Sequence, residues 1–338
     1  MIKVAMLSYW HVHAKDYARQ ADEHPDTQIV AIWDEIPERG RAEAEARGIP
    51  FVEDLNLLLA DPEIQGVIVD TPTELHSEVI LAAARAGKHI FTEKVVAPTY
   101  KEVNEIVAAV EQAEVKLTVS LPRLNHNYTL AIQDVLKQEL LGQLTLVRTR
   151  LSHGGGLSTE TNPSGWLPQH FYNAQQCGGG ALIDLGCHPM YLARLFLGMP
   201  ESVTATYGYV TNREVEDNAV SVLQYANGAA AIIEAGFVNS FSPFVIEVHG
   251  TEGSLLYSDM DRKLLLRTKK HDNQGKEWVE IALGEDKPTA YEQWVKHIQL
   301  GTQAAENIEL AVDLTRLMEA SNLSAAQKVA VRIETLQG

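Results

Sequence analysis

The sequence predicts an α/β N-terminal domain with a parallel sheet (residues 1–121) and an α+β C-terminal domain with an open, mainly antiparallel sheet (residues 122–338). In the first third of the chain, short apolar runs alternate with helical patterns, which is typical of βαβ units. From residue 202 to residue 256, strand patterns follow one another, which indicates an antiparallel sheet. The length of 338 residues is enough for two separate hydrophobic cores.

Hydrophobic spacing and turn residues define the elements of the first domain. A capping box formed by Thr99 and Glu102 starts its clearest helix, in which apolar residues recur at i, i+3, i+4 and i+7. Gly87 ends the preceding alanine-rich helix as a C′ glycine. The expected strands are residues 3–7, 29–33, 66–69, 89–91 and 116–120, and the expected helices are residues 13–21, 39–47, 75–86 and 100–113.

The second domain begins with a helix and continues mostly as strands. Asn227 and Gly228 form the strongest short hairpin signal in the chain. A last helical region is expected from residue 291 to about residue 330. The other expected elements are helices at residues 128–140 and 189–197 and strands at residues 144–151, 203–209, 219–225, 229–237 and 244–249.

Composition excludes several classes of partner. The formal charge of -17 repels polyphosphate backbones, so we expect no nucleic acid partner. Only Cys177 and Cys187 are present, without CxxC spacing, which favours a reducing compartment. The N-terminal residues lack a signal-peptide pattern, and no stretch is apolar enough for a membrane span. We therefore expect a cytoplasmic protein with a small-molecule partner.

The loop after the first strand departs from a dinucleotide-binding pattern. Ser8, Trp10 and His13 occupy the places of the three glycines of G-x-G-x-x-G. Asp34, however, ends the second strand, where an acid accepts hydrogen bonds from a ribose diol, although it also fits a turn. Glu35 would repel a 2′-phosphate, so NAD is favoured over NADP, and Arg39 is the nearby cation that could reverse this preference.

Three segments, in this order and spacing, indicate a family. Residues 71–76 follow the third strand, residues 86–94 include the fourth, and residues 178–188 combine a glycine run with an aspartate and a histidine. Together they resemble the glucose–fructose oxidoreductase / inositol dehydrogenase (Gfo/Idh/MocA) family. The resemblance implies an NAD-binding Rossmann domain and hydride transfer between nicotinamide and a hydroxyl or carbonyl carbon of a sugar, inositol or related polyol.

The resemblance also implies catalytic residues. Lys94 matches the active-site lysine of the family's Glu-Lys-Pro motif, with valine in place of the proline, and Asp184 and His188 match its Asp-x-x-x-His pair. Alcohol oxidation needs a base for the hydroxyl proton, and a lysine or a carboxylate-oriented histidine can supply one. Alternatively, Lys94 is a solvated strand-end lysine and Asp184 a helix N-cap. Pro189 biases His188 away from helical geometry, and Tyr191 stands where the family commonly has an acid.

The remaining candidates are grouped by role. The cofactor-binding candidates are Ser8, Trp10, His11, His13, Asp34, Thr71, Pro72, His76, Glu93 and Lys94. The substrate-binding candidates are Arg123, His153, Trp166 and His170, because aromatic faces and planar polar groups bind sugars. Loop packing is the alternative for Trp166 and His170. No metal is expected in this interpretation.

Three other functions remain open. His11 and His13 have the H-x-H spacing of metal-dependent hydrolases. The fold also suits a redox-silent NAD-binding regulator. Some relatives of the family use transient oxidation by NAD to cleave a glycosidic bond, which would make the protein an NAD-dependent glycosidase.

Apolar residues on both faces of the expected sheet predict assembly. Val220 and Val222 alternate with Leu223 and Tyr225, so covering one face would leave the other exposed. We therefore expect a homodimer or homotetramer that associates through this sheet.

Overall fold

The computed structural model describes residues 1–272 and 274–338. The chain forms two compact units. The first unit contains Met1–Pro122, Pro288–Thr315 and Gly338, and the second contains Arg123–Lys287 and Arg316–Gln337. Residues 288–315, which the sequence assigned to the second domain, group with the first unit because helix α9 (Ala290–Leu300) buries Tyr291 and Trp294 in its core.

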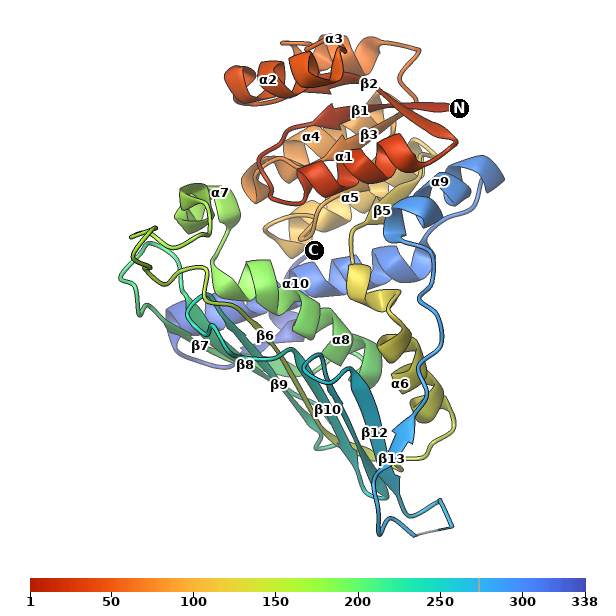
Figure 1. Cartoon of the computed structure of the whole chain (residues 1–338), viewed down its shortest axis with the longest axis vertical. Coiled ribbons are helices and arrows are strands. Elements are labelled where there is room, and N and C mark those ends of the chain that lie inside the picture. The colour runs from red at the N-terminus through yellow and green to blue at the C-terminus, as the bar shows by residue number, and fades with distance from the viewer. Residues whose placement is uncertain (273) are drawn as a thin grey trace. The chain divides into compact units, whose positions relative to one another are not determined.

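The first unit is built on a five-stranded parallel sheet with the strand order β2-β1-β3-β4-β5 (Figure 1). Its strands are β1 (Ile2–Leu7), β2 (Thr27–Trp33), β3 (Gly66–Val69), β4 (His89–Thr92) and β5 (Leu117–Val119). All five lie where the sequence predicted them. The capping box of Thr99 and Glu102 is also present.

Helices cover both faces of this sheet. Its helices are α1 (Ala14–Glu23), α2 (Pro37–Arg47), α3 (Leu55–Ala60), α4 (Thr73–Arg85), α5 (Tyr100–Gln112) and α9. The chain leaves β1 toward β2 and then returns past β1 to β3. Because βαβ crossovers are right-handed, α1 packs on one face and α4 and α5 on the other. This reversal makes the gap between the carboxyl ends of β1 and β3 the topological switch point, where such sheets bind ligands.

The second unit is built on a nine-stranded sheet with the order β13-β12-β11-β10-β6-β9-β8-β7-β14. Its strands are β6 (Leu144–Ser152), β7 (Ser202–Gly208), β8 (Asn218–Gln224), β9 (Ala230–Gly236), β10 (Val245–Gly250), β11 (Gly253–Ser258), β12 (Lys263–Thr268), β13 (Val279–Ile281) and β14 (Val331–Arg332). Neighbouring strands are antiparallel except β6 and β9, which are parallel. The prediction of a mainly antiparallel sheet is confirmed.

The helices after residue 122 differ from expectation in two places. The last helical region is two helices, α9 and α10 (Ala305–Gln327), because Gly301 ends α9 in a left-handed conformation with φ 68°. Helix α8 (Cys187–Leu197) continues directly from a π-helical turn at Leu182–Gly186. His188 is therefore helical, contrary to the bias expected from Pro189, because the proline lies in the first turn of α8, where its missing N–H is tolerated. The second unit also contains α6 (Asn127–Lys137) and α7 (Ala174–Cys177).

Helix α8 packs on β6 and β9, and the burial along the strands shows that one sheet face is more open. Leu223 and Tyr225 are buried, whereas Val222 is half-buried and Val220 is 38% exposed. One face of the sheet is therefore covered and the other is more exposed, as the alternating apolar residues predicted. Among the described residues, no helix is long and apolar enough to cross a membrane.

Candidate active site

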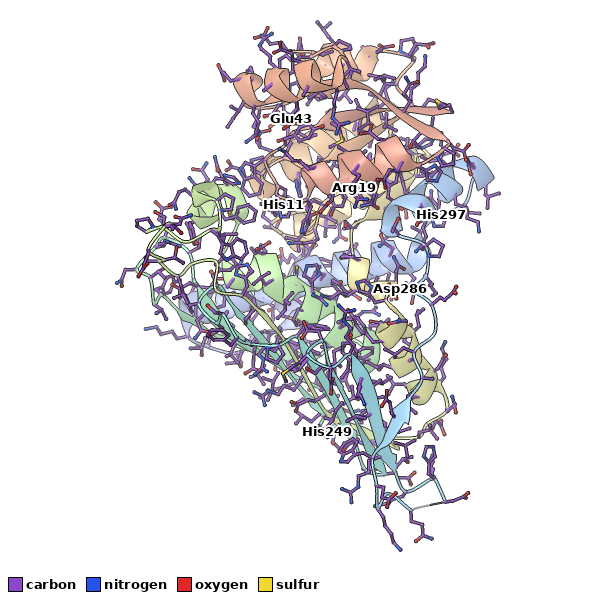
Figure 2. All side chains as sticks on the ribbon, in the orientation of Figure 1. His11, Arg19, Glu43, His249, Asp286 and His297 are labelled. Carbon is purple, nitrogen blue, oxygen red and sulfur yellow. The ribbon has the colours of Figure 1, made fainter. Side chains whose placement is uncertain are left out.

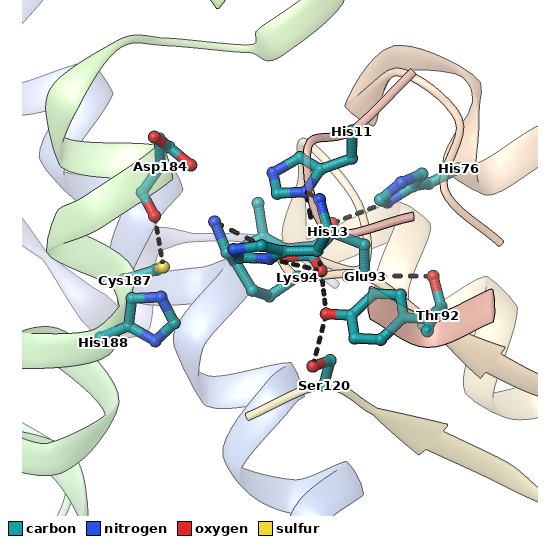
Figure 3. Close-up of polar contacts among 12 residues, drawn as sticks. His11, His13, His76, Thr92, Glu93, Lys94, Ser120, Asp184, Cys187 and His188 are labelled. Carbon is teal, nitrogen blue, oxygen red and sulfur yellow. Dashed lines mark hydrogen bonds and ion pairs between the residues drawn. The ribbon is translucent and has the colours of Figure 1, made fainter. Parts of the chain in front are cut away.

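Polar side chains gather at the switch point of the first unit. His11 and His13 follow β1, and Glu93 and Lys94 follow β4 (Figure 3). Asp70 follows β3, where its main-chain carbonyl accepts a hydrogen bond from the His11 amide at 3.3 Å. His11 lies just before α1, and Arg19 lies farther along that helix (Figure 2). The sequence candidates from separate loops are thus brought together within one sheet edge.

Glu93 is the centre of this group and is only 1% exposed. Its Oε2 accepts a hydrogen bond from the Tyr17 hydroxyl and lies 3.3 Å from His13 Nδ1 and 3.9 Å from His11 Nδ1. Its Oε1 lies 3.6 Å from Lys94 Nζ. Burial would raise the pKa of Glu93, but the charges of His11, His13 and Lys94 outweigh burial and hold the pKa well below its usual range. Glu93 is therefore an anion surrounded by nitrogen groups.

Asp70 is the second acid at this edge. It is 0% exposed, and neither of its carboxylate oxygens has a hydrogen-bond partner among the described residues. Burial, followed by the charge of Glu93, raises the pKa of Asp70 well above its usual range. The sequence analysis did not single out Asp70, although an acid at the end of a central parallel strand is a signal that could have identified it.

The loop after β1 makes a tight turn without glycine. Ser8 has φ 81°, the left-handed conformation that glycine adopts most easily. Its hydroxyl compensates by accepting a hydrogen bond from the Trp10 amide at 3.0 Å and another from Arg39 at 3.2 Å. Trp10 itself is buried. The first function of the missing glycines, the turn, is therefore retained by Ser8.

Asp34 is held within the protein. Arg39 donates to both of its oxygens, at 2.9 and 2.7 Å, while the amides of Tyr9 and Ile36 donate at 2.9 and 2.8 Å. Its carboxylate is thus occupied by the loop and by Arg39. The neighbouring Glu35 accepts from Arg39 at 2.6 Å through Oε1, whereas its buried Oε2 has no hydrogen-bond partner among the described residues.

His76 joins two loops of the first unit. Its Nδ1 lies 2.8 Å from the Val95 carbonyl, and its Nε2 lies 3.0 Å from the Thr71 carbonyl. Burial lowers the pKa of His76, with the two carbonyls opposing that effect. Thr71 and Pro72 form the start of α4 beneath this bridge. His76 thereby fixes the segment after β3 to the segment that contains Lys94.

In the second unit, His188 contacts the hydroxyl of Tyr191. The Tyr191 hydroxyl lies 3.1 Å from His188 Nδ1 and accepts a hydrogen bond from the Arg123 amide at 3.0 Å. The hydroxyl accepts from that amide and keeps its own proton, which it can donate to Nδ1. Burial raises the pKa of Tyr191 well above its usual range, so it stays a neutral donor. The Tyr191 hydroxyl thus lies where it can orient the His188 ring.

The other candidates of the second unit form a separate aromatic group. Asp184 lies in the π-helical turn, not at the N-cap of α8, which is Gly186. Its charge acts on His153, opposing the larger effect of burial, which lowers the pKa of His153. The His153 ring stacks on Phe237 at 5.3 Å and lies 4.6 Å from the exposed Trp166.

Arg123 and His170 have packing contacts. The Arg123 guanidinium lies 3.9 Å above the Phe244 ring and donates to the Tyr128 hydroxyl at 3.0 Å. His170 is half-buried, and its carbonyl accepts a hydrogen bond from Cys177 Sγ at 3.3 Å.

Comparison with known proteins decides the family. A model described as "Oxidoreductase family, NAD-binding Rossmann fold" matches residues 3–121, and the GFO/IDH/MocA C-terminal domain matches residues 129–256. The 1,5-anhydro-D-fructose reductase of Ensifer adhaerens is 31% identical over 233 residues, 68% of each protein. The chain belongs to the GFO/IDH/MocA oxidoreductase family. The resemblance inferred from the sequence is confirmed.

Other family members extend this comparison. The inositol 2-dehydrogenase of Rhizobium meliloti is 31% identical over 251 residues, which cover 72% of this chain and 71% of that protein. A putative NADPH-dependent oxidoreductase from Desulfitobacterium hafniense has the same fold, with a TM-score of 0.85 at 19% identity over 100% of this chain and 99% of that one. Levoglucosan dehydrogenase in complex with NADH and levoglucosan has a TM-score of 0.80 at 22% identity, covering 98% and 99%. The first unit of this GFO/IDH/MocA protein is thus the NAD-binding Rossmann fold of a dehydrogenase family.

The contact of Tyr191 with His188 leads to a prediction. Tyr191→Phe removes the donor to Nδ1 and should lower kcat about tenfold, the effect of one hydrogen bond of about 1.4 kcal/mol. Without that donor the imidazole protonates more easily, so the acid limb of the kcat profile should move to higher pH. Steady-state kinetics across pH check this, with the exposed Tyr209→Phe as the control. An unchanged profile in Tyr191→Phe would contradict the orienting role.

Proposed function

We propose that this protein transfers a hydride between NAD and a secondary alcohol or carbonyl carbon of a sugar, inositol or related polyol. The observation that supports this most strongly is Lys94, the lysine of the family motif, buried beside Glu93 at the switch point. The relatives named for inositol and anhydrofructose chemistry support a neutral polyol as substrate.

The residues of the first unit can hold a dinucleotide, although the contacts differ from those expected of the G-x-G-x-x-G loop and Asp34. Ser8 supplies the left-handed turn, and Asp34 secures the loop through Arg39. Glu35 Oε2, which has no hydrogen-bond partner among the described residues, can accept a ribose hydroxyl. When bound, the nicotinamide accepts or donates the hydride. Lys94 then holds or releases the hydroxyl proton of the substrate.

In the second unit, we assign polyol binding to His188, whose Nδ1 is occupied by Tyr191, and to the ring pair His153 and Trp166. An imidazole whose Nδ1 accepts a hydrogen bond carries its proton on Nε2, where it can donate to a hydroxyl oxygen. Asp184, through its charge on His153, would orient that second ring.

The acids after β2 predict the choice of cofactor. Asp34 and Glu35 place two carboxylates where a 2′-phosphate would have to bind, and both already share Arg39. We expect NAD to bind at least about tenfold more tightly than NADP, a difference of about 1.4 kcal/mol. Isothermal titration calorimetry with each dinucleotide checks this, and equal or tighter binding of NADP would contradict it.

The more open sheet face supports a dimer or tetramer as the working assembly. Burying Val220 and Val222 between copies would remove apolar surface from water. Val220→Asp should therefore shift the mass measured by light scattering at micromolar concentration from oligomer to monomer. Leu57→Asp, at an exposed leucine of α3, is the matched control. A wild-type monomer would contradict this proposal.

A cytoplasmic location remains part of the proposal. Cys177 and Cys187 each direct their sulfur to a main-chain carbonyl, of His170 and Asp184, at 3.3 and 3.1 Å. Such buried thiols suit a reducing compartment.

The direct test of the function is a substrate screen. The purified protein is incubated with NAD or NADP and a panel of inositols, aldoses, anhydrosugars and glycosides, and both reduced cofactor and released aglycone are followed. We expect reduced nicotinamide in proportion to the polyol oxidised. Release of aglycone without net reduction would instead identify an NAD-dependent glycosidase.

A further inference from the structure

We infer that His11, His13 and Glu93 form a binding site for one divalent transition-metal ion, in addition to the proposed hydride transfer. One nitrogen from each histidine and one oxygen of Glu93 all lie within 4.8 Å of one another. Two imidazoles and one carboxylate are the protein ligands of many catalytic zinc sites and of non-haem iron sites. The inference goes beyond the proposed function, because no step assigned above uses a metal.

The distances are close to those that an ion requires. Two ligand atoms bound at about 2.1 Å in tetrahedral geometry lie roughly 3.4 Å apart. His13 Nδ1 and His11 Nδ1 lie 3.3 and 3.9 Å from the same oxygen, Glu93 Oε2. His11 Nδ1 also accepts a hydrogen bond from the His13 amide at 3.2 Å, so an ion bound to this nitrogen would replace that bond.

The fold holds these ligands in position. The two histidines project from the loop that replaces the glycine-rich turn, and Glu93 is anchored at the end of β4 by its amide, which donates to the Val69 carbonyl at 3.0 Å. Tyr17 is hydrogen-bonded both to Glu93 and, at 2.6 Å, to Ser120 Oγ, so a chain of hydroxyls supports the carboxylate. Hydrogen bonds of this kind orient metal-binding carboxylates in proteins.

Asp70 is a further buried acid at the same edge of the sheet. Val69 pairs with Thr92 in the parallel ladder, so Asp70 and Glu93 follow at the same level of the sheet. Asp70 is fully buried, and both of its oxygens lack hydrogen-bond partners within the described part of the chain. Buried carboxylates are normally paired or bound to metals, because an isolated one is costly to desolvate. Asp70 lies outside the group of three ligands, so we assign it the role of accepting a proton from a metal-bound water.

The ligand set predicts the type of ion. Imidazole nitrogens favour Zn²⁺ and Fe²⁺ over Mg²⁺ and Ca²⁺, which prefer all-oxygen sites. An ion here would bind Glu93 Oε2. Lys94 Nζ lies 3.6 Å from Oε1, the other oxygen of the same carboxylate. With three protein ligands, one coordination position remains for a water or for an oxygen of the substrate.

The test measures binding of Zn²⁺ alone by the full chain. Protein treated with chelator and then dialysed is titrated with Zn²⁺ by calorimetry, and the metal retained after gel filtration is measured by elemental analysis. We expect one ion per chain and at least about 100-fold weaker binding in His11→Ala and in His13→Ala. Asp70→Asn should weaken binding about tenfold. His249→Ala, at a histidine of β10 outside the cluster, is the matched control and should bind as the wild type does (Figure 2).

Two further readouts keep the result unambiguous. Co²⁺ should produce visible d–d absorption bands in the wild type and in His249→Ala, but not in His13→Ala. The His13 side chain is 40% exposed, so His13→Ala should fold even if His11→Ala does not. Wild-type protein that retains no ion, or variants that bind Zn²⁺ as tightly as the wild type, would overturn the inference. Because these measurements use neither NAD nor a polyol, their failure would leave the proposed hydride transfer standing, and the reverse also holds.

Discussion

Lys94→Ala is expected to lower kcat by roughly 10²–10⁴-fold, the range for loss of general acid–base help. Lys94 is buried, with Nζ 3.6 Å from Glu93 Oε1, so no bulk water replaces it readily as the proton acceptor. Lys94→Arg keeps the positive charge but does not exchange the proton near neutral pH, so it should be impaired nearly as much. Single-turnover measurements of hydride transfer check both variants.

A control variant shows whether a lower rate comes from lost proton transfer or from the removal of any positive charge. Lys15→Ala removes an exposed lysine of α1 that pairs with Glu43 at 3.4 Å, and it should retain the parent rate. NAD titrations should show that Lys94→Ala still binds the cofactor. Hydride transfer by Lys94→Ala at the parent rate would exclude Lys94 as the proton-transfer group.

His188→Ala is expected to reduce kcat by a similar factor, roughly 10²–10⁴-fold. Its Nδ1 lies 3.1 Å from the Tyr191 hydroxyl, which fixes the orientation of the ring that we propose to act on the substrate. NAD affinity should not change, because the candidate dinucleotide contacts belong to the first unit. Stopped-flow kinetics with calorimetry of NAD binding test both statements. The control is His126→Ala, an exposed histidine paired with Asp286 at 3.0 Å (Figure 2). A parent rate in His188→Ala would remove this histidine from the mechanism.

The fold was predictable from the sequence because its signals are local. Each strand of the first sheet is a short apolar run followed by a turn, and the helices between them have caps and period-3.6 spacing. The second sheet was predicted only in part. Strands β11, β12 and β13 are short, and charged turns such as the one around Asp261 and Arg262 separate them. Each of these strands pairs with the strand that precedes it in the sequence, so they are consecutive antiparallel strands that the sequence analysis missed.

The sequence named candidate residues, but it did not predict which side chains they contact. Asp34 matches the position of a ribose-binding acid, yet Arg39 occupies it, because an ion pair five residues apart forms only once α2 is placed. The charge of Asp184 influences the pKa of His153, and the Tyr191 hydroxyl lies 3.1 Å from His188 Nδ1. Asp70 and Tyr17 became candidates only when the sheet order placed β3 and α1 beside β4 and its Glu93. Side-chain partners of this kind are set by the tertiary structure.

The measurement that tests the central claim most directly is the appearance of reduced nicotinamide during a single turnover with NAD and a polyol from the screen. The account predicts one equivalent of NADH per active chain with the wild type, and a rate that falls at least about 100-fold in Lys94→Ala. The same experiment is run with chelator-treated and Zn²⁺-loaded protein, so that a requirement for metal is not mistaken for inactivity. Absence of NADH from every polyol in both forms, together with undetectable NAD binding by calorimetry, would contradict the assignment as an NAD-dependent polyol oxidoreductase.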